Sequence, residues 1–308
     1  MSENSNVLFV THSNDHCGVY QHGTNTVNIL IKNESVYNYI HASCNSEQEL
    51  QGYVNQHTPV AIIYNYHPSV LSWVTPKKYN IPQLAIHHEP EQPLPKGIKA
   101  VISQDPTITE TPGLYSSGRF IFDYENKYPL PEIPTIGSFG FGFPGKGFQR
   151  LVTQVQKEFE EAHIKLHIAY ATYGDHTGAL ARQVADECRS LMHSPGVTLE
   201  ISHDFMDVPQ LIDWLAQNSL NAFLYDFFKG RGISGPPDYA LSARRPIALT
   251  KSYMFKHMWN TADPSIFVED LSLKEIMNNG TGPLQPFYDK WSERNLTDTY
   301  DRIIGDII

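Results

Sequence analysis

The turn within residues 135–151, TIGSFGFGFPGKGFQRL, holds the residues whose types and spacing point most directly to chemistry. Gly140, Gly142 and Gly145 match the dinucleotide-binding pattern GxGxxG, and the segment from Gly140 to Lys146 matches the P-loop pattern GxxxxGK. Both patterns use backbone N–H groups to hold phosphate oxygens. The turn is therefore a candidate site for a phosphate-bearing ligand.

Each pattern lacks the residue that gives it specificity. A P-loop needs Ser or Thr after the lysine to bind magnesium, and Gly147 stands there. A dinucleotide site needs an acid about 20 residues further on, but the next strand is expected to end near Tyr170 without one. What remains is an anion site made by free N–H groups, a helix dipole and the charge of Lys146. The alternative is a tight turn with a solvated lysine.

The elements that must position this turn follow from the apolar pattern. Short apolar runs alternate with amphipathic stretches, which is typical of βαβ units and a parallel sheet covered on both faces. Strands are predicted at residues 6–12, 36–42, 60–66, 83–88, 100–103, 119–124, 136–141, 165–170, 198–203, 221–225, 246–250 and 265–268. Helices are predicted at residues 24–32, 46–56, 147–162, 178–193, 208–217 and 237–243. In such folds ligands bind at the carboxyl ends of the strands.

Three prolines within residues 128–134 interrupt this alternation and indicate an extended connector between two domains. The length of 308 residues is also typical of two domains. We therefore predict one α/β domain at residues 1–130 and a second at residues 131–285. Residues 286–308 are predicted to form a helical tail whose buried side consists of Trp291, Leu296, Tyr300, Ile303 and Ile304.

The composition is typical of a soluble globular protein, with 41% hydrophobic and 18% charged residues. A net charge of -10 disfavours nucleic acid as a partner, because such binding normally needs surplus lysine and arginine. No apolar run approaches the roughly 18 residues of a transmembrane segment, and the first residues lack a secretion signal. Three scattered cysteines predict no disulfides. We therefore expect a cytoplasmic protein.

Residue types that bind metals cluster near the N-terminus: His12, His16, Cys17 and His22. A helix that begins after Gly18 would separate His22 from the others, and no second pair completes four ligands. We therefore predict no metal site. The glycine would instead let the backbone approach a ligand, which places His16, Gly18 and Tyr20 near an acceptor.

The glycine turn resembles the one that opens the second domain of GT-B glycosyltransferases, in particular the large retaining family called glycosyltransferase family 4 or group 1. There a strand is followed by G-R-L-x-x-x-K-G-F and a helix. Gly140 to Phe148 keeps the spacing from glycine to lysine, with Phe141 in place of the arginine. In the family this arginine and lysine hold the donor's diphosphate. The resemblance implies the GT-B fold, two Rossmann-like α/β domains whose parallel sheets face an interdomain cleft.

Further segments resemble the family in the same order along the chain. Residues 204–226 are similar to the segment whose strand leads to the donor site, and residues 230–250 are similar to E-G-F-G-L-P-x-x-E-A-M-A-x-G-x-P-V-I-A-T. Asp238 falls on the second glutamate, which in the family binds the nucleotide ribose, and Gly230 falls on the first. The terminal FYDKWSERNLTDTYDRII resembles the closing helix, which implies that the tail packs back on the first domain.

In the first domain the resemblance points to two strand ends. Cys17–Tyr20 resembles the glycine turn after the first strand, and residues 83–89, QLAIHHE, resemble the strand that ends in His-Asp. His88 and Glu89 are therefore the catalytic candidates. A neutral His88 would bind the donor sugar or take the proton of the acceptor. The alternative is that both are ordinary residues at a strand end.

The second domain would stabilise the negative charge that grows on the leaving diphosphate, a task that GT-B enzymes perform without metal. Lys146 would lie at one helix N-terminus and Arg231 at another, so that Arg231 replaces the missing arginine. The predicted donor-site residues are Gly142, Lys146, Tyr173, Tyr225, Arg231, Gly232, Ser234 and Asp238. The two tyrosines would stack on a base or a sugar. The alternatives are a solvated Arg231 and an Asp238 that only complements its helix dipole.

These expectations together predict a metal-independent glycosyltransferase. It would move a sugar from a nucleotide-diphosphate donor, which is a substrate and not a cofactor, to a sugar, a lipid-linked molecule or a small molecule. Retention of anomeric configuration is implied only by the family. Two alternatives stay open, a nucleotide-sugar epimerase of the same fold and a noncatalytic relative that binds nucleotide sugars.

Overall fold

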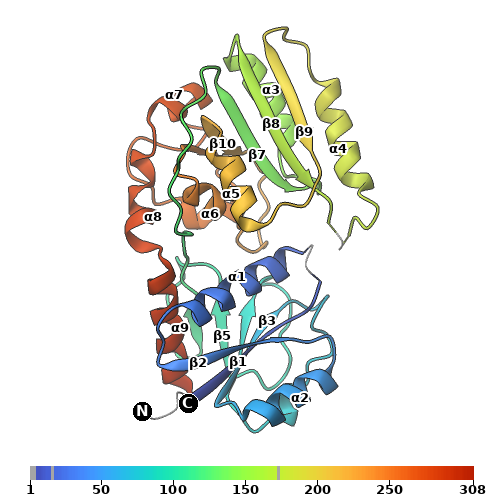
Figure 1. Cartoon of the computed structure of the whole chain (residues 1–308), viewed down its shortest axis with the longest axis vertical. Coiled ribbons are helices and arrows are strands. Elements are labelled where there is room, and N and C mark those ends of the chain that lie inside the picture. Colours follow the sequence, from blue (N-terminus) through green and yellow to red (C-terminus); the bar gives the residue numbers. More distant parts are fainter. Residues whose placement is uncertain (1–4, 15–16, 172–173) are drawn as a thin grey trace. The chain divides into compact units, whose positions relative to one another are not determined.

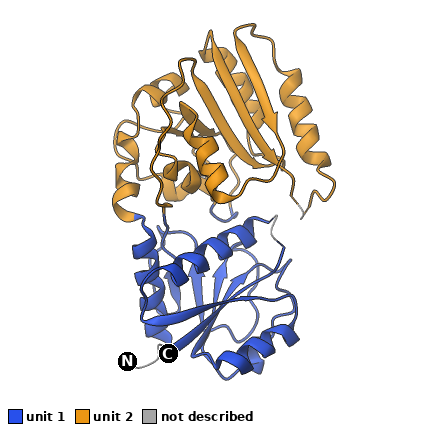
Figure 2. Ribbon diagram, in the orientation of Figure 1, with its two compact units in different colours: residues 1–120, 230–233, 291–308 blue, residues 121–229, 234–290 orange. Residues whose placement is uncertain are grey.

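The computed structural model describes residues 5–14, 17–171 and 174–308, which form two compact units (Figure 2). The first unit comprises Met1–Phe120, Gly230–Ile233 and Trp291–Ile308, and the second comprises Ile121–Lys229 and Ser234–Lys290. The chain thus passes to the second unit at residue 121, where the sequence had suggested residue 131. It also returns to the first unit for four residues before its C-terminal segment.

The first unit is a six-stranded parallel sheet in the order β2-β1-β3-β4-β5-β6. Figure 1 labels β1, β2, β3 and β5 of this sheet. Its strands are β1 Ser5–Thr11, β2 Tyr37–Ser43, β3 Ala61–Tyr66, β4 Gln83–His87, β5 Ala100–Ser103 and β6 Leu114–Ser116. Its helices are α1 Gly18–Lys32, α2 Glu47–His57, the 3-10 turn η1 Pro76–Lys78 and α9 Glu293–Ile307. Side chains alternate along β1: Val7 and Phe9 pack with α1 and α9, whereas Leu8 and Val10 pack with α2.

The second unit is a five-stranded parallel sheet in the order β11-β10-β7-β8-β9. Its strands are β7 Thr135–Phe141, β8 Ala162–Ala169, β9 Val197–Ser202, β10 Leu220–Phe223 and β11 Ile247–Leu249. Its helices are α3 Phe148–Glu158, α4 Ala179–Ser190, α5 Val208–Ala216, α6 Pro236–Ser242, α7 Leu273–Asn278 and α8 Gln285–Lys290, with 3-10 turns η2 Tyr253–Met258 and η3 Gly282–Leu284. One core cluster lies under α3, α4 and α7, and another includes α5.

The predicted α/β class is confirmed, but two of the predicted strands are wrong. Residues 119–124 form no strand, because their alternating aromatic residues belong to different cores: Phe120 packs in the first unit, whereas Phe122 and Tyr124 pack beside α5. The N–H group of Phe122 donates to the side chain of Ser242 rather than to a neighbouring strand. At residues 265–268 a single bridge joins Phe267 to β11, and a turn follows at once.

The C-terminal helix α9 belongs to the first unit and is fixed there by one buried side and one carboxylate. The apolar residues predicted to be buried are all buried, and four of them join the core of β1 and α1. Asp301 accepts hydrogen bonds from the hydroxyls of Ser35 and Tyr39 and from the N–H group of Val36. The strand β1 and the helix α9, which lie far apart in the sequence, therefore share one core.

Candidate functional site

The glycine turn joins β7 to α3, and three of its glycines lie in close contact with neighbouring residues. A Cβ atom on Gly142 would lie 2.4 Å from the Cα atom of Ala181. One on Gly145 would lie 2.3 Å from the ring of Phe228, and one on Gly147 would lie 1.9 Å from the carbonyl oxygen of Leu224. Two glycines of the pattern GxGxxG, Gly142 and Gly145, therefore reflect how tightly the turn packs on α4 and on the loop after β10.

Lys146 is held over an aromatic ring at the start of α3. Its Nζ atom lies 4.2 Å from the centroid of the Tyr225 ring, and Phe255 packs against the same tyrosine at 4.6 Å between centroids. Tyr225 is only 1% exposed. The Tyr225 ring therefore packs against protein on the side of Phe255 and supports the lysine. Its stacking on a base or a sugar stays a prediction.

Among the described residues of the glycine turn, Lys146 is a cation that no carboxylate pairs with. Asp226 donates its N–H to the Gly145 carbonyl oxygen, and its carboxylate pairs with Arg150 on α3 at 2.5 Å. No ion pair of Lys146 is present in the described part of the chain. Helix α3 has no side-chain cap and no acid in its first turn. Its free N–H groups and Lys146 thus favour an anion.

Asp238 and Ser234 lie at the start of α6 in the second unit. The Asp238 carboxylate is 3.8 Å from Nε2 of the buried His257. Ser234 is buried, and its N–H group donates to the carbonyl oxygen of Met254. The backbone of Ser234 is therefore already engaged, whereas the contact of Asp238 with a ribose stays a prediction.

Arg231 and Gly232 lie in the first unit, which corrects the expectation that they accompany α6. Nε of Arg231 is 3.5 Å from the carboxylate of Glu89, and a Cβ atom on Gly232 would lie 2.0 Å from the His88 carbonyl oxygen. The segment at residues 230–233 docks on the end of β4 because these glycines allow close approach. Glu89, one of the two catalytic candidates, is thus partly neutralised by Arg231.

His88 has both ring nitrogens engaged within the protein. Asn65 directs its amide nitrogen to the Val19 carbonyl oxygen, so its Oδ1 atom accepts from Nε2 of His88 at 2.6 Å. Nε2 of Gln104 donates to Nδ1 of His88 at 2.7 Å. Burial and the neighbouring histidines lower the pKa of His88 well below its usual value. Both ring nitrogens thus have protein partners in this structure, and the role of His88 as a base or as a donor to the sugar stays a prediction.

The acceptor residues predicted near the N-terminus are only partly described. His16, like the predicted donor residue Tyr173, lies outside the described residues. Gly18 is the first residue of α1, and the Tyr20 ring lies 5.7 Å from the His12 ring. Sequence reasoning missed Asn65 and Gln104, although an asparagine inside the buried strand AIIYNY was a detectable signal.

Because the first unit buries histidines, we expect its free energy of unfolding to decrease in acid. Burial, with Arg119 adding to it, lowers the pKa of His22 to about 3. Below pH 6.5 the unfolded chain binds a proton that folded His22 does not, so stability is retained above pH 6.5 and falls towards pH 3. We expect a loss of about 1.4 kcal/mol from His22 between pH 7.5 and pH 5.5. Urea unfolding at both values should show this loss in the wild type and a smaller one in His22→Phe; equal losses in the two proteins contradict it.

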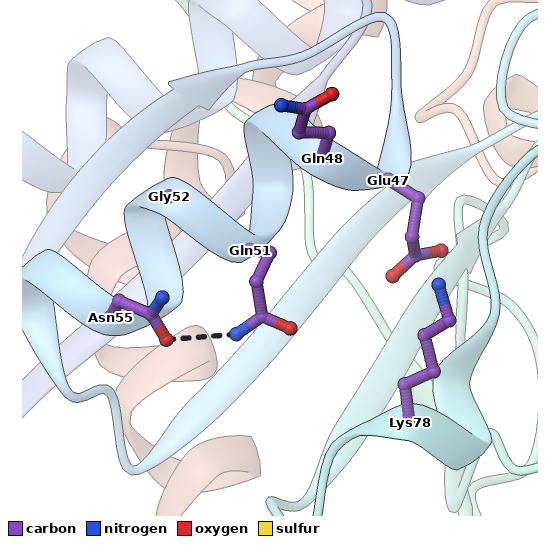
Figure 3. Close-up of a pocket in the computed structure, with 6 residues that line it drawn as sticks. All are labelled: Glu47, Gln48, Gln51, Gly52, Asn55 and Lys78. Carbon is purple, nitrogen blue, oxygen red and sulfur yellow. Dashed lines mark hydrogen bonds between the residues drawn. The ribbon is translucent and has the colours of Figure 1, made fainter.

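A surface hollow of about 550 Å³ lies on α2, lined by Glu47, Gln48, Gln51, Gly52, Asn55 and Lys78 (Figure 3). Gln51 donates to Asn55, and Glu47 accepts from the Thr75 N–H group and the Tyr79 hydroxyl. Three of its polar side chains, Glu47, Gln51 and Asn55, are thus engaged locally, and we do not assign the hollow a ligand. Among the described residues, no group of three potential metal ligands occurs, and no helix is long and apolar enough to span a membrane.

Comparison with known proteins supports the fold through structure alone. No known family matches the sequence, and no curated protein matches it. A glycosyltransferase from Rickettsia africae is 11% identical with a TM-score of 0.69, covering 100% of this chain and 99% of that one. Anabaena HepE in complex with UDP and glucose is 12% identical with a TM-score of 0.67, covering 98% and 99%.

A third similar structure is the N-terminal domain of a trehalose-6-phosphate phosphatase from Candida albicans. It is 10% identical with a TM-score of 0.64, covering 99% of this chain and 97% of that one. At such low identities the likeness establishes the fold, which is GT-B with two Rossmann-like α/β domains. Activity has to be argued from the residues of this chain.

Proposed function

We propose that this protein is a glycosyltransferase that uses a nucleotide-diphosphate sugar. The observation that carries the proposal is Lys146, an unpaired cation among the described residues, at the uncapped start of α3 in a chain of GT-B fold. A diphosphate is the anion that such a site fits. HepE, which shares the fold, was crystallised with UDP and glucose, so we take UDP as the first nucleotide to test.

The proposed chemistry places the leaving diphosphate at the glycine turn. As the bond between the sugar and the diphosphate breaks, negative charge grows on the diphosphate oxygen, and Lys146 and the α3 N–H groups stabilise it. Tyr225 holds the lysine in place because a cation over a buried ring is attracted to its face. The acceptor oxygen forms the new bond to the sugar carbon, and its proton passes to the departing diphosphate oxygen, so that the transfer needs no proton transfer to His88, whose nitrogens are engaged.

A panel of UDP-, GDP-, ADP- and TDP-sugars tests this proposal. We expect one of them to raise the melting temperature and, with a suitable saccharide or lipid-linked acceptor, to give a glycosylated product in the presence of EDTA. An epimeric nucleotide sugar without acceptor would instead indicate an epimerase. Binding without any turnover would indicate a noncatalytic relative, and absence of binding would refute the donor site itself.

We also propose a cytoplasmic location for the reaction. Cys17, Cys44 and Cys188 are free and buried, which suits a reducing compartment.

A further inference from the structure

Three neighbouring strands of the first unit end beside histidines that the proposed transfer does not use. His12 follows β1, His67 follows β3, and His87 is the last residue of β4. These strands are adjacent and parallel, so their carboxyl ends share one edge of the sheet. The His12 and His67 rings also influence each other electrostatically. The edge therefore carries a group of imidazoles.

Two of these rings have their tautomer fixed by the backbone. The Asn14 N–H group donates to Nδ1 of His12 at 3.1 Å, and the Ser69 N–H group donates to Nδ1 of His67 at 3.2 Å. A backbone N–H group can only donate, so both Nδ1 atoms are acceptors and the ring protons are on the Nε2 atoms. Both rings therefore present a neutral N–H donor at Nε2.

His12 Nε2 has no hydrogen-bond partner among the described residues, although the side chain is only 3% exposed. A buried donor without an acceptor is costly and rare in native proteins. An acceptor oxygen from a bound molecule would relieve this cost. The ring of Tyr20, 5.7 Å away, adds an aromatic surface of the kind that saccharide sites use.

The charges near this group disfavour an anion. Glu89 and Arg231, which both act electrostatically on His67, pair with each other. Burial lowers the pKa of both His12 and His67, so the rings stay neutral near pH 7. A phosphate or carboxylate would meet neutral donors and an ion pair without net charge, whereas a hydroxyl oxygen needs no counter-charge.

We infer that His12 and His67 form a binding site for the hydroxyl groups of an uncharged saccharide, which the Nε2–H groups recognise as hydrogen-bond donors. This inference rests on the proposed function in one respect, because it makes that saccharide the acceptor of the transfer. The site itself requires only the first unit. Its ligand class narrows the acceptor to a neutral sugar, free or at the end of a larger glycan.

Nitrogen NMR of the histidine rings in the full-length protein tests the site directly. The probes are methyl α-glucoside, methyl α-mannoside and methyl β-galactoside, with glucose-6-phosphate and glucuronate as charged counterparts. We expect the Nε2–H tautomer at His12 and His67 before addition, and shifts of both rings with at least one neutral glycoside. Shifts with none of these glycosides would mean that water alone occupies the site, and this result overturns the inference.

Two variants of one residue separate hydrogen bonding from packing. His12→Phe removes the donor and should weaken glycoside binding at least tenfold, whereas His12→Gln keeps an N–H group near the Nε2 position and should stay within about threefold of the wild type. Circular dichroism checks that both fold, and His57→Phe on α2 is the control. Unchanged binding in His12→Phe, or binding of the charged sugars alone, overturns the inference; the latter would point to the free N–H groups of α1.

UDP binding is measured on the same proteins to keep the two proposals distinguishable. His12→Phe should leave the stabilisation by UDP unchanged, because the glycine turn and Lys146 belong to the second unit. Glycoside binding without UDP binding in the wild type would refute the donor site and leave the saccharide site standing. UDP binding without glycoside binding would refute the saccharide site and leave the donor site standing.

Discussion

Lys146→Met is expected to lower the rate of sugar transfer by roughly a hundredfold, the order of loss seen when one oxyanion stabiliser is removed. Methionine keeps most of the volume of the side chain and removes its charge. The loss should be larger in the rate than in UDP affinity, because charge on the diphosphate grows as the bond breaks. Single-turnover kinetics and isothermal titration measure the two quantities separately.

Two matched variants decide whether the effect comes from charge at this position. Lys146→Arg retains a cation and should recover a large part of the rate, whereas Lys157→Met removes a lysine from the last turn of the same helix, α3, and should have no effect. Stability should change by only about 0.5–1 kcal/mol, the worth of the contact with Tyr225. A rate loss matched by an equal loss of stability would mean that Lys146 serves the fold alone.

The sequence predicted the sheets because local apolar patterns determine them. Buried parallel strands appear as continuous apolar runs, and β1, β3 and β10 are buried along most or all of their lengths. The pattern failed at residues 119–124, where apolar alternation arose from two separate cores. Periodicity shows that alternate side chains are buried, but it does not show which core buries them.

The site was harder to predict because its hydrogen bonds depend on strand register. The partners of His88 are Asn65 and Gln104, which are 23 and 16 positions away in sequence and come from the flanking strands β3 and β5 or their ends. Nothing local to His88 indicates that both its nitrogens are engaged. The position of Tyr225 at the end of a strand likewise suggested an exposed ring. The packing of Phe255 from η2 shows that the ring is buried.

Arg231 illustrates the same limit for a loop. The resemblance to glycosyltransferases aligned it with the start of α6, its neighbour in sequence, yet it lies in the first unit beside Glu89. Contact over more than a hundred positions of sequence depends on Gly230 and Gly232, whose missing side chains make room for Glu91 and the His88 carbonyl group. Two glycines in a loop predict freedom of the backbone, but they do not predict where it docks.

Gly147→Ala is expected to destabilise the second unit by at least about 3 kcal/mol. The residue has φ 74°, a conformation that disfavours a side chain, and its Cβ atom would lie 1.9 Å from the Leu224 carbonyl oxygen. The three atoms nearest to this Cβ position belong to the backbone of Leu224, so no flexible side chain can move away to make room. The melting temperature of the second unit should fall by roughly 6–12 °C, and UDP binding should weaken because the turn that carries Lys146 is displaced.

Gly52→Ala supplies the matched control for this prediction. Gly52 lies within α2, and a Cβ atom there would meet nothing within 4 Å (Figure 3). The same substitution should therefore stabilise the first unit by about 0.5–1 kcal/mol, since alanine favours a helix over glycine. Calorimetry of the two variants compares one chemical change in opposite settings. If Gly147→Ala melts like the wild type, the turn tolerates a side chain, and its glycine would then have to be explained by ligand binding rather than by packing.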